Sequence, residues 1–201
     1  MDFLLAAIAL ILLSPLLIGI AILIKVNLGS PILFKQERPG YKEKIFTLYK
    51  FRTMTNEKDA KGQLLHTSKR LTKFGRFLRS TSLDELPELL NILKGDMAII
   101  GPRPLIVDYL PYYTNEERDR HSVRPGLSGL AQINGRSTAS WEQRFQYDLE
   151  YIANITFIND IKIIVKTIGK VMKRTDVGEI DVDTPIDFDQ HRKDKQKATL
   201  G

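Results

Sequence analysis

The chain begins with a long apolar segment. The 22 residues from Phe3 to Ile24 contain no charged side chain, and about 20 apolar residues in one helix are enough to cross the hydrocarbon layer of a membrane. Ser14 and Pro15 interrupt this run in its middle. Because proline has no N–H and its ring collides with the preceding turn, we expect two short helices joined at a bend. The residues alone leave a kinked spanning helix and a re-entrant hairpin equally open.

A cleaved signal peptide does not fit the same segment. Such a peptide needs a basic start, a shorter apolar core and a cleavage site of small residues. Here Asp2 precedes the apolar run, the run is too long, and the stretch from Lys25 to Ser30 has no such site. We therefore expect residues 1–25 to be retained as a membrane anchor.

The remaining pattern predicts a small α+β domain that is mostly helical. Residues 31–37 and 45–51 are rich in β-forming side chains, and the Arg-Pro-Gly-Tyr stretch between them favours a turn, so we expect an antiparallel hairpin. The polar stretch from Asn56 to Ser68 is expected to be a surface loop. The catalytic or binding domain would cover residues 26–175. Residues 176–201 are polar and lack periodicity, which predicts a flexible tail.

Two segments of this domain are predicted to form amphipathic helices. Lys69 to Arg79 places apolar side chains at helical spacing among five cations, and Phe157 to Arg174 repeats the pattern with its lysines outside the apolar stripe. Such helices either pack on the core or lie in a lipid interface, and we expect the interface. The aromatic segment from Trp141 to Tyr151 is expected to pack on the core.

Charge is concentrated next to the apolar segment. The net charge is +6, and the stretch from Lys25 to Arg79 holds 14 basic against 4 acidic residues. Basic residues beside a membrane segment favour the cytoplasmic side and attract anionic headgroups. A nucleic-acid surface would be equally basic, but the adjacent anchor favours phospholipid or a phosphorylated substrate. The chain has no cysteine, which excludes disulfides, thiolate metal sites and thiol catalysis.

The stretch from Arg79 to Pro104 carries the densest candidate chemistry. Ser82 and Glu85 match a helix capping box, which explains Glu85 well but the neighbouring Asp84 only in part. Pro87 fits poorly in a helix that begins at Ser82. A helix beginning near Leu86 would instead leave both acids exposed at its start. Spacing alone leaves capping and catalysis open.

Several cations lie in or beside turns and could bind an anionic substrate. They are Lys50, Arg52, Arg79, Arg103, Arg124 and Arg136. Planar guanidinium groups suit phosphate oxygens, and the prolines on both sides of Arg103 reduce the entropy lost when it binds. His121, in a charged stretch, is expected at the surface rather than as a catalytic base. An acidic pair beside arginine-bearing turns favours a phosphorylated substrate.

The sequence resembles the monotopic phosphoglycosyl transferases, the bacterial sugar transferase family, from Phe3 to about Arg174, and is most similar to small members that consist of the catalytic domain alone. The matching stretches are Ser14-Pro15, Gly29 to Gly40, Tyr49 to Met54, Ser82 to Pro87, Leu93 to Met97, Gly101 to Pro104 and Arg124 to Gly129. One departure is Asp2, where the family usually has basic residues. The expected orientation then depends on Lys25 and the cations that follow.

The resemblance implies an enzyme that moves a phospho-sugar from a UDP-sugar to polyprenyl (undecaprenyl) phosphate and releases UMP, at the start of surface glycan assembly. It implies a re-entrant anchor, with the catalytic domain on the cytosolic face of the inner membrane. Asp84 matches the family's nucleophile and Glu85 its partner, with Mg²⁺ bound by Asp84. The six cations named above would contact phosphate or nucleotide, and for those other than Arg103 ion pairing within the fold or contact with lipid headgroups is the alternative.

Two rival functions remain open at this stage. A non-catalytic membrane adaptor would use the basic hairpin and amphipathic helices to bind anionic lipid, with Asp84 and Glu85 only capping a helix. A lipid phosphatase or kinase is the other rival, although the chain has no P-loop pattern.

Overall fold

A computed structural model describes residues 1–135, 139–173 and 188–200. The α-helices are α1 (Asp2–Leu28), α2 (Thr67–Arg70), α3 (Lys73–Ser80), α4 (Leu89–Lys94), α5 (Asn115–Arg118), α6 (Leu130–Gly135), α7 (Trp141–Ala153), α8 (Phe157–Lys173) and α9 (Phe188–Leu200). The 3-10 helices are η1 (Tyr41–Glu43), η2 (Leu83–Glu88), η3 (Val107–Tyr112) and η4 (Asp119–Ser122). The strands are β1 (Leu33–Pro39), β2 (Ile45–Phe51), β3 (Ala98–Ile100) and β4 (Gly126–Ser128). The predicted α+β class, mostly helical with a short hairpin, is confirmed.

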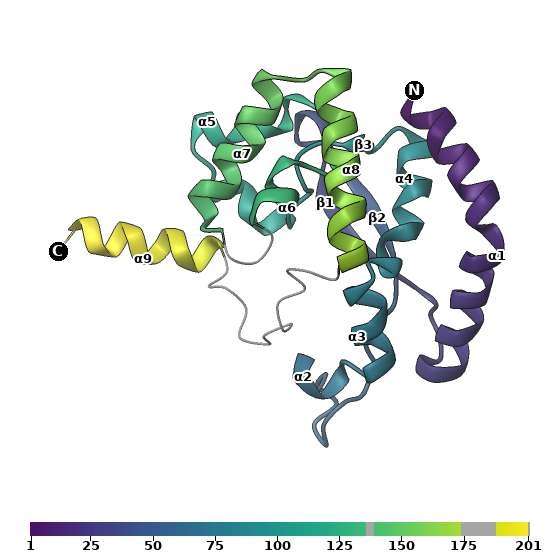
Figure 1. The fold of residues 1–201 in the computed structure, drawn as a ribbon. Coiled ribbons are helices and arrows are strands. Elements are labelled where there is room, and N and C mark those ends of the chain that lie inside the picture. The colour runs from purple at the N-terminus through teal and green to yellow at the C-terminus, as the bar shows by residue number, and fades with distance from the viewer. Residues whose placement is uncertain (136–138, 174–187, 201) are drawn as a thin grey trace.

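The apolar segment forms α1, a single helix that curves along one side of the domain (Figure 1). The expected division into two helices is wrong, because the helix continues past Ser14 and Pro15. Proline removes the N–H that would have bonded to the carbonyl of Ile11, and the Ser14 hydroxyl donates to that carbonyl at 2.7 Å instead. The serine therefore compensates for the proline, and the interruption bends the helix without ending it.

One face of α1 packs on the domain along most of its length. Ala6 belongs to a cluster with residues of β2 and α4, and Ile20 and Ile24 belong to a second cluster with Phe51 and Leu78. Most other apolar side chains of α1 are exposed, and the helix is long and apolar enough to cross a membrane. A helix of this composition with an uncovered apolar face is typical of contact with lipid.

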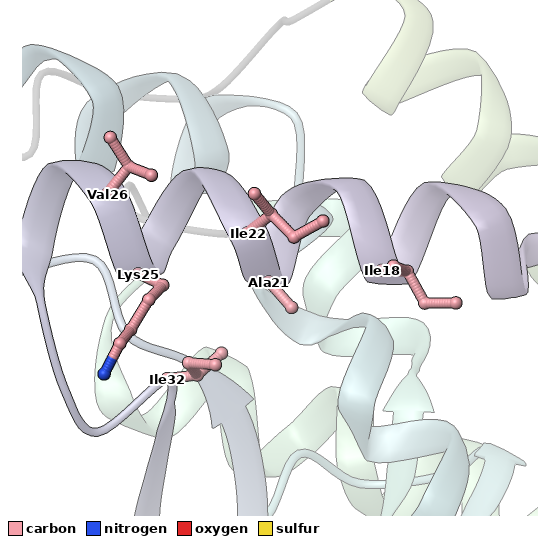
Figure 2. Close-up of a pocket in the computed structure, with 6 residues that line it drawn as sticks. All are labelled: Ile18, Ala21, Ile22, Lys25, Val26 and Ile32. Carbon is pink, nitrogen blue, oxygen red and sulfur yellow. The ribbon is translucent and has the colours of Figure 1, made fainter.

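The second half of α1 also borders a shallow apolar hollow of about 270 Å³. Figure 2 shows its lining, which comes from successive turns of α1 and from Ile32 in the segment leading to β1. Lys25 is the only charged residue of this lining, and its ammonium group bonds to the Ser30 hydroxyl at 2.5 Å. The hollow belongs to the same exposed apolar side of the helix.

The predicted hairpin is present. β1 and β2 pair antiparallel from Leu33 opposite Phe51 to Pro39 opposite Ile45. Asn91 of α4, which is fully buried, donates to the carbonyl of Thr47 at 2.7 Å and accepts from the N–H of Tyr49 at 3.1 Å. These bonds fix α4, and with it the preceding η2, against the hairpin.

A second pair of strands, β3 and β4, is parallel and was not predicted. Its backbones approach so closely that a Cβ on Gly126 would lie 2.1 Å from the nitrogen of Gly101. The N–H of Gly101 bonds to the carbonyl of Ser128 at 2.9 Å, and the N–H of Gly126 bonds to the carbonyl of Pro102 at 3.0 Å. Glycine at these two positions thus permits the close backbone contact that holds the loop carrying Arg103.

The two predicted amphipathic segments are helical but differ in exposure. In the first, which forms α2 and α3, Leu71 and Leu78 are buried and Phe77 is exposed. In α8 the apolar stripe is largely uncovered, with Phe157, Ile158, Ile161, Val165, Ile168 and Met172 exposed. The surface loop predicted between Asn56 and Ser68 is confirmed as a mostly exposed segment that ends where α2 begins. Placement at a lipid interface stays a prediction.

Regular structure extends into the predicted tail. Residues 188–200 form α9, which contradicts the expectation of a segment without helical structure, whereas residues 174–187 lie outside the described part. Ion pairs of Arg192 with Glu117 and of His191 with Glu142 attach α9 to the domain. The sequence lacked a helical apolar stripe because, among residues 188–195, the one buried apolar side chain is that of Phe188. Its fully buried ring packs among Tyr109, Tyr113, Trp141 and Phe145. The predicted packing of the Trp141 segment, now α7, is confirmed.

Candidate active site

The acidic pair lies on the short 3-10 helix η2, between α3 and α4. Within the described residues the alternative of a capping box fails, because Ser82 adopts a left-handed conformation with φ 54° and its side chain makes no cap hydrogen bond. Pro87 is accommodated because η2 is a 3-10 helix that gives way to α4 at Leu89. Asp84 and Glu85 are therefore free of the capping role that the sequence allowed.

Two predicted cations hold Glu85. The ammonium of Lys50, on β2, and the Nη2 atom of Arg103, in the loop after β3, each lie 2.7 Å from Glu85 Oε1. Burial acts to raise the pKa of Glu85, but the charges and hydrogen bonds of Arg103 and Lys50 prevail and lower it. The same attraction raises the pKa of Arg103. Glu85 is thus ionised at neutral pH and anchors two cations.

Asp84 has a different environment although it is the next residue. Its side chain is buried, and no residue of the described part donates a hydrogen bond to its carboxylate. Burial, followed by the charge of Glu85, raises its pKa to about 6, while the charges of Lys50, Arg79 and Arg103 act in the opposite direction. A carboxylate that is ionised near neutral pH and not engaged by donors is available as a nucleophile or a metal ligand.

Glu88 is a third acid of the site, which sequence reasoning missed. Its carboxylate is almost fully buried, and Oε1, which has no hydrogen-bond partner in the described structure, lies 3.2 Å from the Lys50 ammonium. Burial and the charge of Glu85 raise its pKa to about 7. Its position one helical turn after Asp84 and Glu85 was the signal that could have identified it.

The other predicted cations have separate surroundings. Arg79 donates from Nε to the Thr53 hydroxyl at 2.9 Å and interacts electrostatically with Asp84. Arg52 is buried and donates to the carbonyls of Leu28 and Ser30, which fastens the end of α1 to β2.

Arg124 and Arg136, the remaining two of the six predicted cations, are not among the residues that contact the acidic pair in the described structure. Arg124 pairs with Asp2 at 3.2 Å, near the start of α1, and Arg136 lies outside the described residues. The structure therefore brings Lys50, Arg79 and Arg103 to the acidic pair, and it gives Arg52 and Arg124 contacts with α1. Phosphate binding by any of them stays a prediction.

Two further arginines add positive charge around Arg103. Burial and the charge of Arg103 lower the pKa of Arg38 to about 10, and the same two causes lower the pKa of Arg144. Arg38 lies in the Arg-Pro-Gly stretch at the end of β1, so the turn signal used for the other arginines could have found it. Arg144, within α7, gave no such signal. Cations that repel one another in this way are stabilised when an anion binds between them.

His121 is buried, which makes the expectation of a surface histidine wrong. Burial and the charge of Arg120 lower its pKa to about 4, so it is neutral at physiological pH. Its ring packs against Tyr113 at a centroid distance of 5.4 Å. The charged residues around it in the sequence had suggested exposure, but Arg118 pairs with Glu43 and Arg120 pairs with Asp148.

Comparison with known proteins places the chain in a family. The model of the bacterial sugar transferase family matches residues 1–174, and the chain belongs to this family. It is 55% identical over 149 residues to the sugar transferase EpsL of Bacillus subtilis, an alignment that covers 74% of each chain. It is 38% identical to the exopolysaccharide production protein ExoY of Sinorhizobium fredii, over 85% of this chain and 83% of that one.

A larger relative carries a more specific name. The chain is 40% identical to the UDP-glucose:undecaprenyl-phosphate glucose-1-phosphate transferase of Xanthomonas campestris, over 85% of this chain and 38% of that protein. The present chain thus corresponds to less than half of the length of that relative.

Proposed function

We propose that this protein is a membrane-bound transferase that moves a phospho-sugar from a UDP-sugar to undecaprenyl phosphate and releases UMP. The observation that carries the proposal is the contrast within the acidic pair. Glu85 is clamped by Lys50 and Arg103, whereas Asp84 is buried without a hydrogen-bond donor from the described residues. Family membership and the name of the Xanthomonas relative support the same reaction.

In the first step, an Asp84 carboxylate oxygen attacks the phosphorus that bears the sugar. A new bond forms between that oxygen and the phosphorus, and the bond from the phosphorus to the bridging oxygen breaks, so that UMP leaves with the bridging oxygen. In the second step, a phosphate oxygen of the lipid attacks the same phosphorus and releases the Asp84 carboxylate. A covalent intermediate divides one difficult transfer into two easier ones.

The neighbouring cations have complementary roles in this proposal. Arg103 is partly exposed and reaches Glu85 with one nitrogen, which leaves other guanidinium N–H groups for the negative charge that develops on the leaving UMP. Lys50 and Arg79 hold the diphosphate close to Asp84. Glu85 keeps Lys50 and Arg103 in place, and because its pKa is low it is not the group that exchanges protons at neutral pH.

The residues also fit a magnesium ion. Mg²⁺ is commonly bound by one or two carboxylates together with substrate phosphates and water, and Asp84 with its unengaged carboxylate meets that need, with Glu88 close by in sequence. No group of three or more potential ligands is present in the described part of the chain, so the substrate phosphates would complete the site. When bound, the ion would reduce the repulsion between Asp84 and the diphosphate.

The membrane arrangement follows from the same chain. We propose that α1 is re-entrant, that the apolar face of α8 lies at the lipid interface, and that the acidic pair faces the cytosol. Lys162, Lys166 and Lys173 of α8 are exposed beside its apolar stripe, as expected for contact with anionic headgroups. The adaptor alternative explained the acidic pair as a helix cap, and the pair does not form the capping box that this explanation needs.

Replacement of Asp84 by Asn tests the nucleophile directly. We expect no measurable UMP release from a UDP-sugar in the presence of undecaprenyl phosphate, because the amide cannot form the acyl phosphate. The control is Asp108→Asn, the same change at an exposed aspartate, which should retain wild-type turnover. Substantial turnover by Asp84→Asn would show that Asp84 is not the nucleophile.

Mass spectrometry provides the second readout. Wild-type enzyme quenched after incubation with UDP-sugar alone should carry a phospho-sugar adduct on the peptide that contains Asp84, and the Asp84→Asn variant should carry none. An adduct on another residue would redirect the mechanism. A panel of UDP-sugars in the UMP-release assay would identify the donor, and chelation by EDTA followed by Mg²⁺ addition would test the metal requirement.

A further inference from the structure

A buried ion pair, Arg120 with Asp148, is connected to the candidate active site through the backbone of Arg103. Arg120 of η4 donates to Asp148 Oδ2 of α7 from Nε at 3.0 Å and from Nη2 at 2.7 Å. The same Nη2 atom donates to the carbonyl oxygen of Arg103 at 2.7 Å. Both side chains are almost completely buried. One guanidinium group thus joins α7 and η4 to the loop that carries Arg103.

Stability alone is a poor reason for such a pair. Removing two charges from water is costly, and well-packed apolar residues of similar volume often stabilise a core equally well. The surroundings here are aromatic, with the guanidinium carbon of Arg120 5.8 Å from the Tyr113 ring centre and 5.7 Å from that of Phe145. An apolar pair would fill this space but would offer no donor to the carbonyl of Arg103.

On the side before Arg103, a backbone hydrogen bond holds the loop. The carbonyl of Pro102 accepts from Gly126 N–H at 3.0 Å, which ties the loop to β4. Pro104 has no N–H to contribute, so the peptide group that follows Arg103 can be held only through its carbonyl. Arg120 supplies this contact, and Asp148 fixes the plane of the Arg120 fork. The position of the Arg103 backbone then determines whether its side chain reaches Glu85.

We propose that Arg120 and Asp148 are positioning residues that hold Arg103 against Glu85 for the transfer reaction. This inference rests on the proposed function, in which Arg103 stabilises the leaving UMP. Neither residue touches the substrate. Their effect on turnover is therefore transmitted through Arg103, and it should disappear when the Arg103 side chain is absent.

A double-mutant comparison tests this dependence. In otherwise wild-type protein we expect Asp148→Asn, which preserves shape but removes the charge, to lower kcat for UMP release at least tenfold with little change in KM. In an Arg103→Ala background, assayed at higher enzyme concentration, the same change should lower kcat less than twofold. The matched control is Glu150→Gln, which removes an exposed carboxylate from the same helix and should leave both backgrounds unchanged.

Arg120→Lys gives a second, independent arm, since it keeps a buried positive charge but loses the fork. It should show the same dependence on Arg103. Fluorescence of Trp141, the sole tryptophan, monitors folding of every variant. Equal losses of kcat in the two backgrounds, or unfolding of both Asp148→Asn and Arg120→Lys, would show a purely structural role and overturn the inference. Absence of UMP release by wild-type protein with every UDP-sugar would instead overturn the proposed function, and this inference with it.

Discussion

Asp84 and Glu85 are neighbours in sequence but differ in protonation behaviour because of their partners. Glu85 has two cations at 2.7 Å, whereas Asp84 is buried with the charge of Glu85 beside it. Environments that separate the pKa values of adjacent acids are typical of sites in which the two groups have different roles. Here the acid with the raised pKa is the proposed nucleophile, and the acid with the lowered pKa organises the cations.

The raised pKa of Asp84, about 6, predicts an acidic limit to the first step. Only the ionised carboxylate attacks phosphorus, so the rate of adduct formation should rise with pH through about 6 and level off above 7. Adduct formation from UDP-sugar alone should be measured between pH 5 and 9, because the lipid phosphate then contributes no titration of its own. A rate that stays constant down to pH 5 would contradict the assignment.

The raised pKa of Glu88 predicts that the stability of the protein depends on pH. The pKa of Glu88 is about 7 in the fold against an ordinary value of 4.5, so between these pH values the unfolded chain loses a proton that the folded chain keeps. The contribution of Glu88 to stability therefore falls as pH rises from 4.5 to 7, by about 3 kcal/mol in total.

The neutral variant Glu88→Gln should avoid this cost. We expect it to melt at a higher temperature than wild type at pH 8, and at a similar temperature at pH 4, as monitored by Trp141 fluorescence in detergent. Lys50 keeps Glu85 as its partner in the variant. A lower melting temperature of Glu88→Gln at pH 8 would mean that the Lys50 contact outweighs the burial cost.

At the scale of elements, local patterns predicted those parts of the fold that depend on local interactions. The hairpin followed from two β-rich runs around a Pro-Gly turn, and α8 followed from helical spacing. The parallel pair β3 and β4 was missed because each strand has three residues, too few for a period-two pattern. The continuity of α1 was missed because it depends on one hydroxyl, that of Ser14, which replaces the bond lost at Pro15.

In the candidate site, too, residues with local sequence signals were predicted, and residues that depend on long-range contacts were not. Asp84, Glu85 and Arg103 were found because they lie in turn-like sequence with strong local signals, or through the family resemblance. Arg144 and the Arg120–Asp148 pair were not found, because their relation to Arg103 exists only after η4 and α7 pack beside the loop. At His121 the opposite error occurred: a charged stretch suggested exposure, but Arg118 and Arg120 pair with Glu43 and Asp148, and His121 is buried.

The close packing of α3 on the segment after β2 provides a test of whether the site needs this contact. A Cβ on Gly75 would lie 1.8 Å from the carbonyl oxygen of Thr53, so Gly75→Ala must push α3 away from this segment. Arg79, on the same helix, would then lose its bond to the Thr53 hydroxyl. We expect lower thermal stability and at least a tenfold loss of UMP release.

The matched control for Gly75→Ala is Gly169→Ala in α8, where an added Cβ meets nothing within 4 Å. This change removes a glycine from a helix interior and should stabilise the protein slightly, by up to about 1 kcal/mol, with unchanged activity. If both variants behave alike, the close contact at Gly75 is not a constraint on the site.

At the scale of the whole molecule, α1 is attached to the same domain at both ends. Near its start Asp2 pairs with Arg124, and at its end the carbonyls of Leu28 and Ser30 accept from Arg52. A helix of 27 residues is about 40 Å long, and its inner face packs on the domain between these two contacts. If α1 spanned the bilayer, the domain packed along it would have to enter the membrane as well.

This arrangement predicts that both ends of α1 lie on one side of the membrane. Because the chain has no cysteine, single substitutions provide clean labelling sites: Phe3→Cys at the start of α1, Asn27→Cys at its end, and Lys61→Cys in the exposed loop as a reference for the domain. An impermeant maleimide should label all three in inverted membrane vesicles and none of them in intact spheroplasts. Labelling of Phe3→Cys from the side opposite to Lys61→Cys would establish a spanning helix. In that case the ion pair of Asp2 with Arg124 could not form in the membrane, while the chemistry proposed for Asp84 would still stand on its own test.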